Sequence, residues 1–230
     1  MISISNLQFS YRGRGSSASS FGMRIAALSV PQESSTALVG PSGSGKTTLL
    51  GLIAGTLRAD SGSISVNDHA ITRFNDAELG RFRIGNIGQV FQAFELLSYL
   101  TVTENVMVPW YISGNGRKAD IRERAAELLC GVGLESKLSA MPEELSQGEQ
   151  QRVAVCRAML NNPPVLLADE PTGNLDQGNK QIVVDLLVEQ ARQNNSTLLM
   201  VTHDESLLAS FESVLDMRDV AQAPERENRQ

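Results

Sequence analysis

The 230-residue sequence lacks most of the features that mark membrane, secreted or disordered chains. It holds only 2 cysteines, and aromatic residues make up 5% of it. The longest uninterrupted apolar stretch, 106–112, is far shorter than the roughly 18 residues that would suggest a membrane-spanning helix. The first residues lack the charged segment and apolar core of a signal peptide. With 41% hydrophobic and 20% charged residues, we expect a globular cytoplasmic protein with a substantial core.

Positive charge is also scarce. Lysine and arginine number 20 against 26 aspartates and glutamates, a formal net charge of −6, so no nucleic-acid partner is expected. Cys130 and Cys156 lie among apolar or small neighbours at helical spacing. We therefore expect two buried, reduced thiols rather than a disulfide or a zinc site.

The order of the expected elements indicates an α/β fold. No repeat of 20 to 50 residues is visible, which argues against a solenoid. Alternating apolar residues at 2–9 predict an edge strand or a hairpin, and a Gly/Ser-rich loop follows at 12–20. Further strands are expected at 36–39, 63–66, 165–168 and 197–202, and helices from 46 onward and at 177–193. Such alternation is typical of a parallel sheet with helices on its faces.

The middle of the chain differs from its two ends. Residues from about 94 to 160 show no good strand pattern and include an amphipathic helical pattern after residue 120, which predicts a helical insertion. We expect one domain over residues 1–220. The last residues, 221–230, contain nothing apolar larger than alanine and are expected to form a disordered tail.

A phosphate-binding loop is the clearest motif. Residues 40–47 fit the pattern G-x-x-x-x-G-K-[ST], between an expected strand and an expected helix. In such a loop, backbone N–H groups and the helix dipole bind phosphates. Lys46 would neutralise the β- and γ-phosphates, and the Thr47 hydroxyl would ligate Mg²⁺. We therefore expect a nucleoside triphosphate to bind Gly40, Pro41, Ser42, Gly43, Ser44, Gly45, Lys46, Thr47 and Thr48.

Two carboxylates end the apolar strand at 165–168. Because ligands of open parallel sheets bind beyond the carboxyl ends of the strands, Asp169 and Glu170 are expected near the phosphate loop. One could hold Mg²⁺, and the other could align and deprotonate an attacking water. His203 follows the next apolar strand and is expected beside the γ-phosphate. Gln92 also follows an expected strand, but spacing alone does not choose its role.

The segment 145–152, LSQGEQQR, resembles the LSGGQ signature of ATP-binding-cassette (ABC) ATPases. Ser146 and Glu149 also fit a capping box at the start of a helix that runs through Met159. The resemblance covers about residues 1–217. It implies a P-loop NTPase (RecA-like) core with an antiparallel β subdomain and an inserted α-helical subdomain, ATP and Mg²⁺ as cofactors, and ATPase activity.

The resemblance also implies roles for single residues. The family's ATPases form head-to-tail dimers in the ATP-bound state, so Ser146 and Gly148 are expected to complete the partner's ATP site. Glu170 matches the catalytic base, supported by Lys46 and the switch histidine His203. Asp169 matches the Mg²⁺ ligand, with Thr47 and Gln92. The remaining matches are Tyr11 as the aromatic on adenine, with Phe9 as the alternative, Gln92 of the Q-loop and Asp176 of the D-loop.

Two stretches depart from the family pattern. The signature has Gln147 where glycine is usual and Glu149 where glutamine is usual. Function is expected to survive because Ser146 and Gly148 are retained. The segment 215–219 lacks the usual Asp-Gly turn, which puts the family's C-terminal hairpin in doubt.

Several stretches resemble one group within the family, the cassettes of lipoprotein release and macrolide export: 40–48, 88–97, 101–106 and 161–164. That likeness implies a separate permease and a location on the cytoplasmic face of the inner (cell) membrane. The alternatives are the ATPase of an importer and a soluble ABC ATPase of DNA repair. The apolar residues Phe94, Leu96, Leu97 and Tyr99 fit either a socket for the permease or ordinary core.

Overall fold

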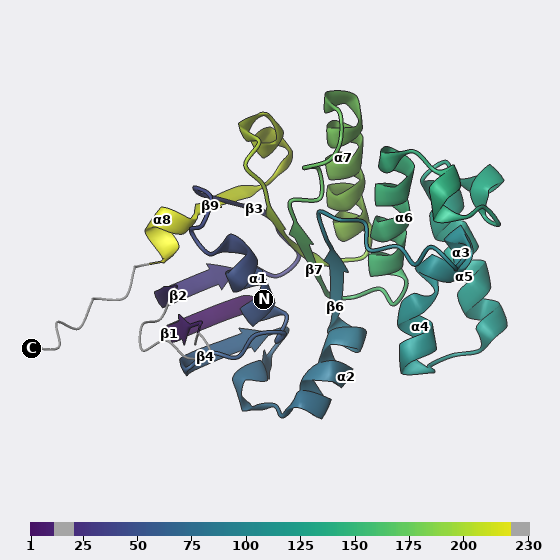
Figure 1. The fold of residues 1–230 in the computed structure, drawn as a ribbon. Helices are drawn as coiled ribbons and strands as arrows, with labels where there is room; N and C mark the ends of the chain where they lie inside the picture. The colour runs from purple at the N-terminus through teal and green to yellow at the C-terminus, as the bar shows by residue number, and fades with distance from the viewer. Residues whose placement is uncertain (12–20, 222–230) are drawn as a thin grey trace, which may run out of the picture.

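The structure, a computed structural model, describes residues 1–11 and 21–221. The expected loop at 12–20 and all but the first residue of the expected tail lie outside the described residues. In the described chain, two sheets lie side by side and a group of helices flanks the second (Figure 1).

The first sheet is antiparallel. Its strand order in the described chain is β2-β1-β4-β5, with β1 Ile2–Ser10, β2 Gly22–Val30, β4 Ser61–Val66 and β5 His69–Ala70. β1 pairs with β2, as the hairpin prediction requires. Because β1 also pairs with β4 on its other side, the alternative prediction of an edge strand is wrong. Asn67 and Asp68 both have positive φ, 47° and 63°, which suits the tight turn between β4 and β5.

The second sheet is parallel and carries the site. Its order among the described strands is β6-β7-β8-β3-β9. The bounds are β3 Ser35–Val39, β6 Ile87–Val90, β7 Val165–Asp169, β8 Thr197–Val201 and β9 Ser213–Asp216. β3 pairs with β8 on one side and β9 on the other. The strands expected at 36–39, 165–168 and 197–202 therefore form this sheet together with β6, and β9 is an added edge strand.

The helices begin and end close to their sequence signals. Asn75, Thr101 and Ser146 each form a capping box at the start of a helix, and Asp176 caps α7. From residue 91 to residue 160 the described chain forms helices and turns but no strand, as the sequence predicts. The α-helices are α1 Lys46–Ile53, α2 Asp76–Asn86, α3 Val102–Val106, α4 Val108–Ser113, α5 Lys118–Gly131, α6 Gln147–Met159, α7 Gln177–Gln193 and α8 Met217–Val220. Short 3₁₀ turns lie at Ile71–Arg73, Glu135–Lys137, Pro142–Glu144 and Glu205–Ser210.

Each face of the parallel sheet belongs to a different core. Leu166, Leu198 and Met200 point into a core that includes α6 and α7. Their neighbours Leu167 and Leu199 point into the other core, which α1 and the antiparallel sheet complete. Because side chains alternate along a strand, a sheet buried on both faces needs continuous apolar strands. The apolar runs that predicted β7 and β8 have this cause.

The expectation for the two cysteines is confirmed for one of them only. Cys156 is buried, and desolvation raises the pKa of its thiol to about 12, but Cys130 is exposed. The prediction for Cys130 is wrong because this residue follows the buried Leu129 on α5 and is therefore turned about 100° away from the apolar face. The doubt about a C-terminal hairpin is in line with the described residues, in which the short helix α8 and not a further strand directly follows β9.

Candidate nucleotide-binding site

The loop between β3 and α1 is the centre of the site. Lys46 is buried at the first position of α1, and its Nζ donates hydrogen bonds to the carbonyl oxygens of Gly40 (2.8 Å) and Pro41 (3.1 Å). Gly45 before it has a φ of 95°, in the left-handed region that favours glycine. A Cβ there would stand 2.8 Å from the Phe21 ring. The loop is thus a positively charged nest at a helix N-terminus.

The carboxylates predicted from the sequence lie opposite this loop. Thr47 Oγ1 donates a hydrogen bond to Asp169 Oδ1 at 3.3 Å, from the first turn of α1 to the end of β7. Burial raises the pKa of Asp169, and the nearby charge of Glu170 adds to the rise. The hydrogen bond from Thr47 and the charge of Lys46 lower the same pKa and offset part of this rise. A partly buried carboxylate beside a second one favours a cation, because a cation stabilises both charged forms.

Glu170 turns the chain away from the sheet. Its φ is 45°, unusual for a residue with a side chain, and its N–H donates to the carbonyl of Val201 at 3.1 Å. The Glu170 carboxylate lies 3.3 Å from Nδ1 of His203, which follows β8. The structure therefore brings Lys46, Thr47 and Asp169 together at one end of the sheet, with Glu170 and His203 beside them.

A hollow of about 320 Å³ opens over the phosphate loop. Tyr11 borders it with 42% of its surface exposed, and its hydroxyl lies 3.4 Å from Thr48 Oγ1. Phe9, the alternative aromatic, is 7% exposed and packs in the core. Phe21 also borders the hollow and was not predicted from the sequence. It lies directly opposite Tyr11, whose N–H donates to the Phe21 carbonyl at 3.0 Å, so an aromatic residue facing Tyr11 across the hairpin is the signal that could have found it. The lining residues are Tyr11, Phe21, Ser42, Gly43, Gly45, Lys46, Thr47, Thr48 and Glu170.

The signature residues do not line this hollow. Ser146 caps α6, and its hydroxyl donates a hydrogen bond to the Glu149 carboxylate at 2.7 Å. This bond and a second one from the Ser146 N–H lower the pKa of Glu149. A Cβ on Gly148 would stand 2.6 Å from Oδ1 of Asn179 in α7. The start of α6 is therefore packed against the start of α7, and the N-terminus of α6 presents Ser146 at the surface.

Gln92 likewise lies outside the hollow. Its side chain rests against Gly173, where a Cβ would stand 2.8 Å from Gln92 Nε2, and its carbonyl accepts a hydrogen bond from Asn174 Nδ2 at 3.2 Å. The segment around Gln92 and the segment 173–176, which resemble the family's Q-loop and D-loop, thus contact each other within one chain. Asp176, in the second of these segments, accepts the N–H of Asn179 at 3.1 Å.

A groove of about 330 Å³ lies between β6, α2, α4 and α6. Phe91, Val108, Pro109 and Ile112 give it an apolar side, and Arg83, Glu95 and Arg157 give it charge. Phe94 and Leu96 pack instead against the core, so the core alternative holds for those two. Tyr99 is 73% exposed and is not part of the groove.

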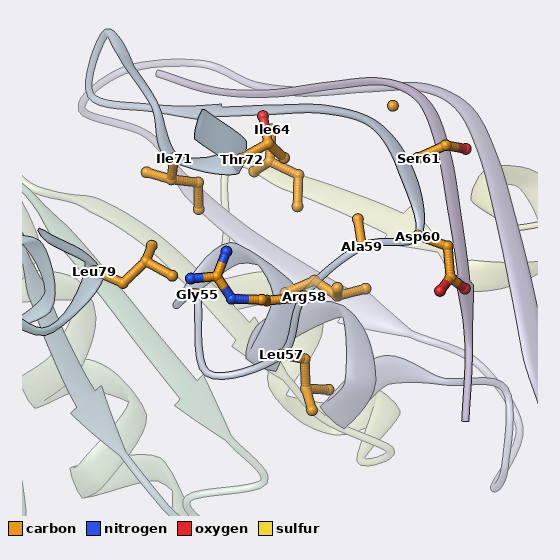
Figure 2. Close-up of a pocket in the computed structure, with 12 residues that line it drawn as sticks. Gly55, Leu57, Arg58, Ala59, Asp60, Ser61, Ile64, Ile71, Thr72 and Leu79 are labelled. Atoms are coloured by element: carbon orange, nitrogen blue, oxygen red, sulfur yellow. The ribbon is translucent and has the colours of Figure 1, made fainter. Parts of the chain in front are cut away.

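Another hollow, of about 220 Å³, lies at the far end of α1. Figure 2 shows the Arg58 side chain crossing it between Ala59 and Leu79. The Arg58 guanidinium donates to Asp76 through Nε and Nη2 and to the Phe74 carbonyl through Nη1. The Arg58 charge is thus paired with that of a carboxylate, whereas Lys46 of the phosphate loop bonds to neutral carbonyls, so Lys46 is the cation better placed to bind a phosphate.

Comparison with protein families bears on this geometry. Residues 23–173 match the family described as ABC transporter. A lipoprotein-releasing system ATP-binding protein, LolD 1 of Rhodopirellula baltica, is 40% identical over 221 residues, 96% of this chain and 95% of that protein. LolD of Bacteroides thetaiotaomicron is 43% identical over 182 residues, 79% of this chain and 83% of that protein.

Solved structures show the same fold. A dimeric post-hydrolysis state of the ATP-binding cassette MJ0796, bound to ADP and Pi, superposes with a TM-score of 0.83 at 31% identity. The match covers 97% of this chain and 98% of that one. A second dimeric structure of MJ0796, described as a bacterial ABC transporter cassette, gives 0.82 at the same identity and the same coverage.

Proposed function

This chain belongs to the ABC transporter family and is an ATPase, and from that premise we propose that it drives a separate membrane permease of the lipoprotein-release or macrolide-export group. The observation that carries the proposal is that the turn at Lys46 and Thr47 faces the strand end at Asp169 and Glu170. The chain that holds this arrangement is 40% identical to a lipoprotein-releasing cassette over nearly its whole length. We propose that residues 1–220 act as one unit at the cytoplasmic face of the cell membrane. In the described residues, no helix is long and apolar enough to cross a membrane.

The phosphate loop binds the triphosphate in this proposal. Lys46 exchanges its bonds to the Gly40 and Pro41 carbonyls for the β- and γ-phosphates, and the backbone N–H groups of residues 42–48 surround them. Tyr11 and Phe21 contact the adenine, because they are the aromatics that border the hollow.

Mg²⁺ suits the donor set beside the loop. Thr47 and Asp169 offer a hydroxyl and a carboxylate, the oxygen ligands that Mg²⁺ prefers together with phosphates and waters. Gln92 joins them only when its side chain leaves Gly173. When bound, Mg²⁺ neutralises charge on the phosphate oxygens.

Hydrolysis is assigned to Glu170. Its carboxylate accepts a proton from the attacking water, and His203, 3.3 Å away, orients that carboxylate and contacts the γ-phosphate. Glu170→Gln is expected to bind ATP but to lower its hydrolysis about 10²–10⁴-fold, the usual contribution of a general base. Turnover near that of the wild type would contradict this role.

Two chains form the complete site. We propose a head-to-tail homodimer in which Ser146 and Gly148 of one chain contact the γ-phosphate held by the other, and in which Asp176 meets the partner. The exposed start of α6 supports this, because a helix N-terminus attracts anions, and the Ser146 hydroxyl would exchange its bond to the Glu149 carboxylate for one to the phosphate. Glu170→Gln with ATP is expected to elute as a dimer in gel filtration. Glu170→Gln/Lys46→Ala is the matched control and is expected to remain monomeric.

The groove beside the Q-loop is the proposed contact for the permease. It joins an apolar side at Phe91 and Ile112 to the charged Arg83 and Glu95, as expected of a surface that leaves and rejoins a partner. Arg157 fixes the segment that follows Gln92, because its guanidinium donates to the carbonyls of Phe94 and Glu95. Movement of a helix in this groove would therefore act on the chain that follows Gln92.

A pull-down identifies the permease. Tagged Glu170→Gln protein is incubated with ATP and detergent-solubilised native membranes, and the bound proteins are read by mass spectrometry. A permease with few membrane spans and a large extracytoplasmic domain is expected, and Ile112→Asp in the groove is the matched control that should lose it. Recovery of a many-spanning permease with a solute-binding protein, or of a DNA-associated protein, would contradict the proposal.

A further inference from the structure

The first turn of α7 is joined to the chain that follows the switch histidine. Lys180 Nζ lies 2.9 Å from Asp204 Oδ2, and both side chains are shielded, at 20% and 18% exposure. Asp204 comes directly after His203. Exposed ion pairs contribute little, but a shielded pair between two elements can fix their relative position.

Asp204 is also the local anchor of its own segment. Its carboxylate accepts the Ser206 hydroxyl at 2.6 Å and the Ser206 N–H at 3.2 Å, and its backbone N–H donates to Thr202 Oγ1 at 3.1 Å. The imidazole of His203 is by contrast 62% exposed, so little side-chain packing holds its ring. The position of His203 therefore depends on its backbone, which Asp204 fixes.

Lys180 is at the same time tied to the D-loop. Its N–H donates to the carbonyl of Asp176 at 3.0 Å, closing the first turn of α7. Asp176 caps that turn through Asn179, whose N–H and side-chain Nδ2 both donate to the Asp176 carboxylate. A displacement of Asp176 therefore carries Lys180 with it.

We propose that Lys180 is a positioning residue that sets His203 against Glu170 and couples this placement to the D-loop. The inference rests on the proposed roles of Glu170, His203 and Asp176. When the partner chain contacts Asp176, the first turn of α7 and the Lys180–Asp204 ion pair hold His203 where it orients Glu170 and contacts the γ-phosphate. Binding of ATP does not depend on this link, because the phosphate loop is on another element.

The test measures kcat and KM for ATP in Lys180→Met, Lys180→Arg, Asp204→Asn and the Lys180→Met/Asp204→Asn double variant. Arg192→Met is the matched control, since Arg192 pairs with Glu189 near the exposed far end of the same helix. We expect kcat to fall about tenfold in Lys180→Met with KM within about twofold, because small displacements of a catalytic group cost rate more than binding. Arg192→Met should match the wild type.

Three further results separate positioning from a loss of structure. Lys180→Arg should recover most of kcat because it restores the charge. The double variant should be no slower than the slower single variant, since both changes remove one interaction. In a Glu170→Gln background, Lys180→Met should still form the ATP-bound dimer. Asp204→Asn keeps the acceptor for Ser206, so it provides the same test if Lys180→Met does not fold.

The inference is overturned by a kcat of Lys180→Met close to the wild type, by Lys180→Arg as slow as Lys180→Met, or by additive losses in the double variant. Each of these leaves the ATPase itself intact. Absence of hydrolysis in the wild-type protein would instead contradict the proposed function, so the two failures are distinct.

Discussion

Asn105 offers the sharpest test of how the chain after the Q-loop is held. It is fully buried in α3, at 0% exposure. Its Oδ1 accepts the N–H of Leu97 at 2.7 Å, and its Nδ2 donates to the carbonyls of Leu97 (3.0 Å), Leu100 (2.9 Å) and Thr101 (3.1 Å). One side chain thus closes the loop 97–101.

The cost of Asn105→Ala follows from which groups have another partner. The carbonyls of Leu97 and Thr101 also accept backbone N–H groups, from Leu100 and from Asn105 itself. Among the residues that the structure describes, the Leu97 N–H and the Leu100 carbonyl bond only to the Asn105 side chain. Two unsatisfied groups at about 1–3 kcal/mol each, in a half-buried loop, give a loss of about 3 kcal/mol. For a chain of this size that corresponds to a Tm lower by about 6–12 °C.

Urea unfolding followed by circular dichroism measures this loss. Asn105→Asp keeps the acceptor for Leu97 but turns a carboxylate toward three carbonyls, so it should be at least as unstable as Asn105→Ala. Asn115→Ala, at an exposed turn, is the matched control and should change stability by less than about 0.5 kcal/mol. A loss below about 1 kcal/mol in Asn105→Ala would refute the reasoning, since it would mean that water replaces these bonds freely.

Three other predictions each test one local feature of the structure. Lys46→Ala should weaken ATP binding at least about tenfold in a fluorescence titration, because it removes the buried cation of the loop; unchanged affinity would contradict the phosphate-loop assignment. A thiol reagent should label Cys130 in the native protein and Cys156 only after unfolding, which mass spectrometry of the labelled peptides distinguishes. Arg218 lowers the pKa of Asp216 to about 2, so the stability from this pair is present above about pH 4 and is lost as the pH falls toward 2. Asp216→Asn should flatten that part of an acid-unfolding curve, and an unchanged slope would count against the pair.

The features that the sequence predicts well are local ones. The phosphate loop needs a strand, a glycine turn and a lysine in direct succession, and all three are contiguous at β3 and α1. The start of α6 follows from Ser146 and Glu149, three residues apart, and α7 was expected at its observed bounds. In each case the stabilising partners lie within one or two turns of each other.

Features that depend on distant partners could not be predicted in the same way. β1 lies inside its sheet because β4, more than 50 residues later, pairs with its other edge. Gln92 follows β6 as expected, but its packing on Gly173 depends on the D-loop. Lys180 carries no motif at all, and its partner Asp204 is found only through the crossing of α7 and the segment after β8.

The placement of β3 has a consequence for the order in which the site can form. β3 leads into the phosphate loop within the first 40 residues, yet both of its neighbours, β8 and β9, come after residue 196. Strands so far apart in the chain pair late in folding, because closing a long loop costs entropy before any contact repays it. During synthesis, the sheet under the phosphate loop therefore stays incomplete until the strands after residue 196 have been made. We therefore expect affinity for nucleotide to arise only after β8 and β9 have paired with β3, so that nucleotide binding would report on completion of this sheet.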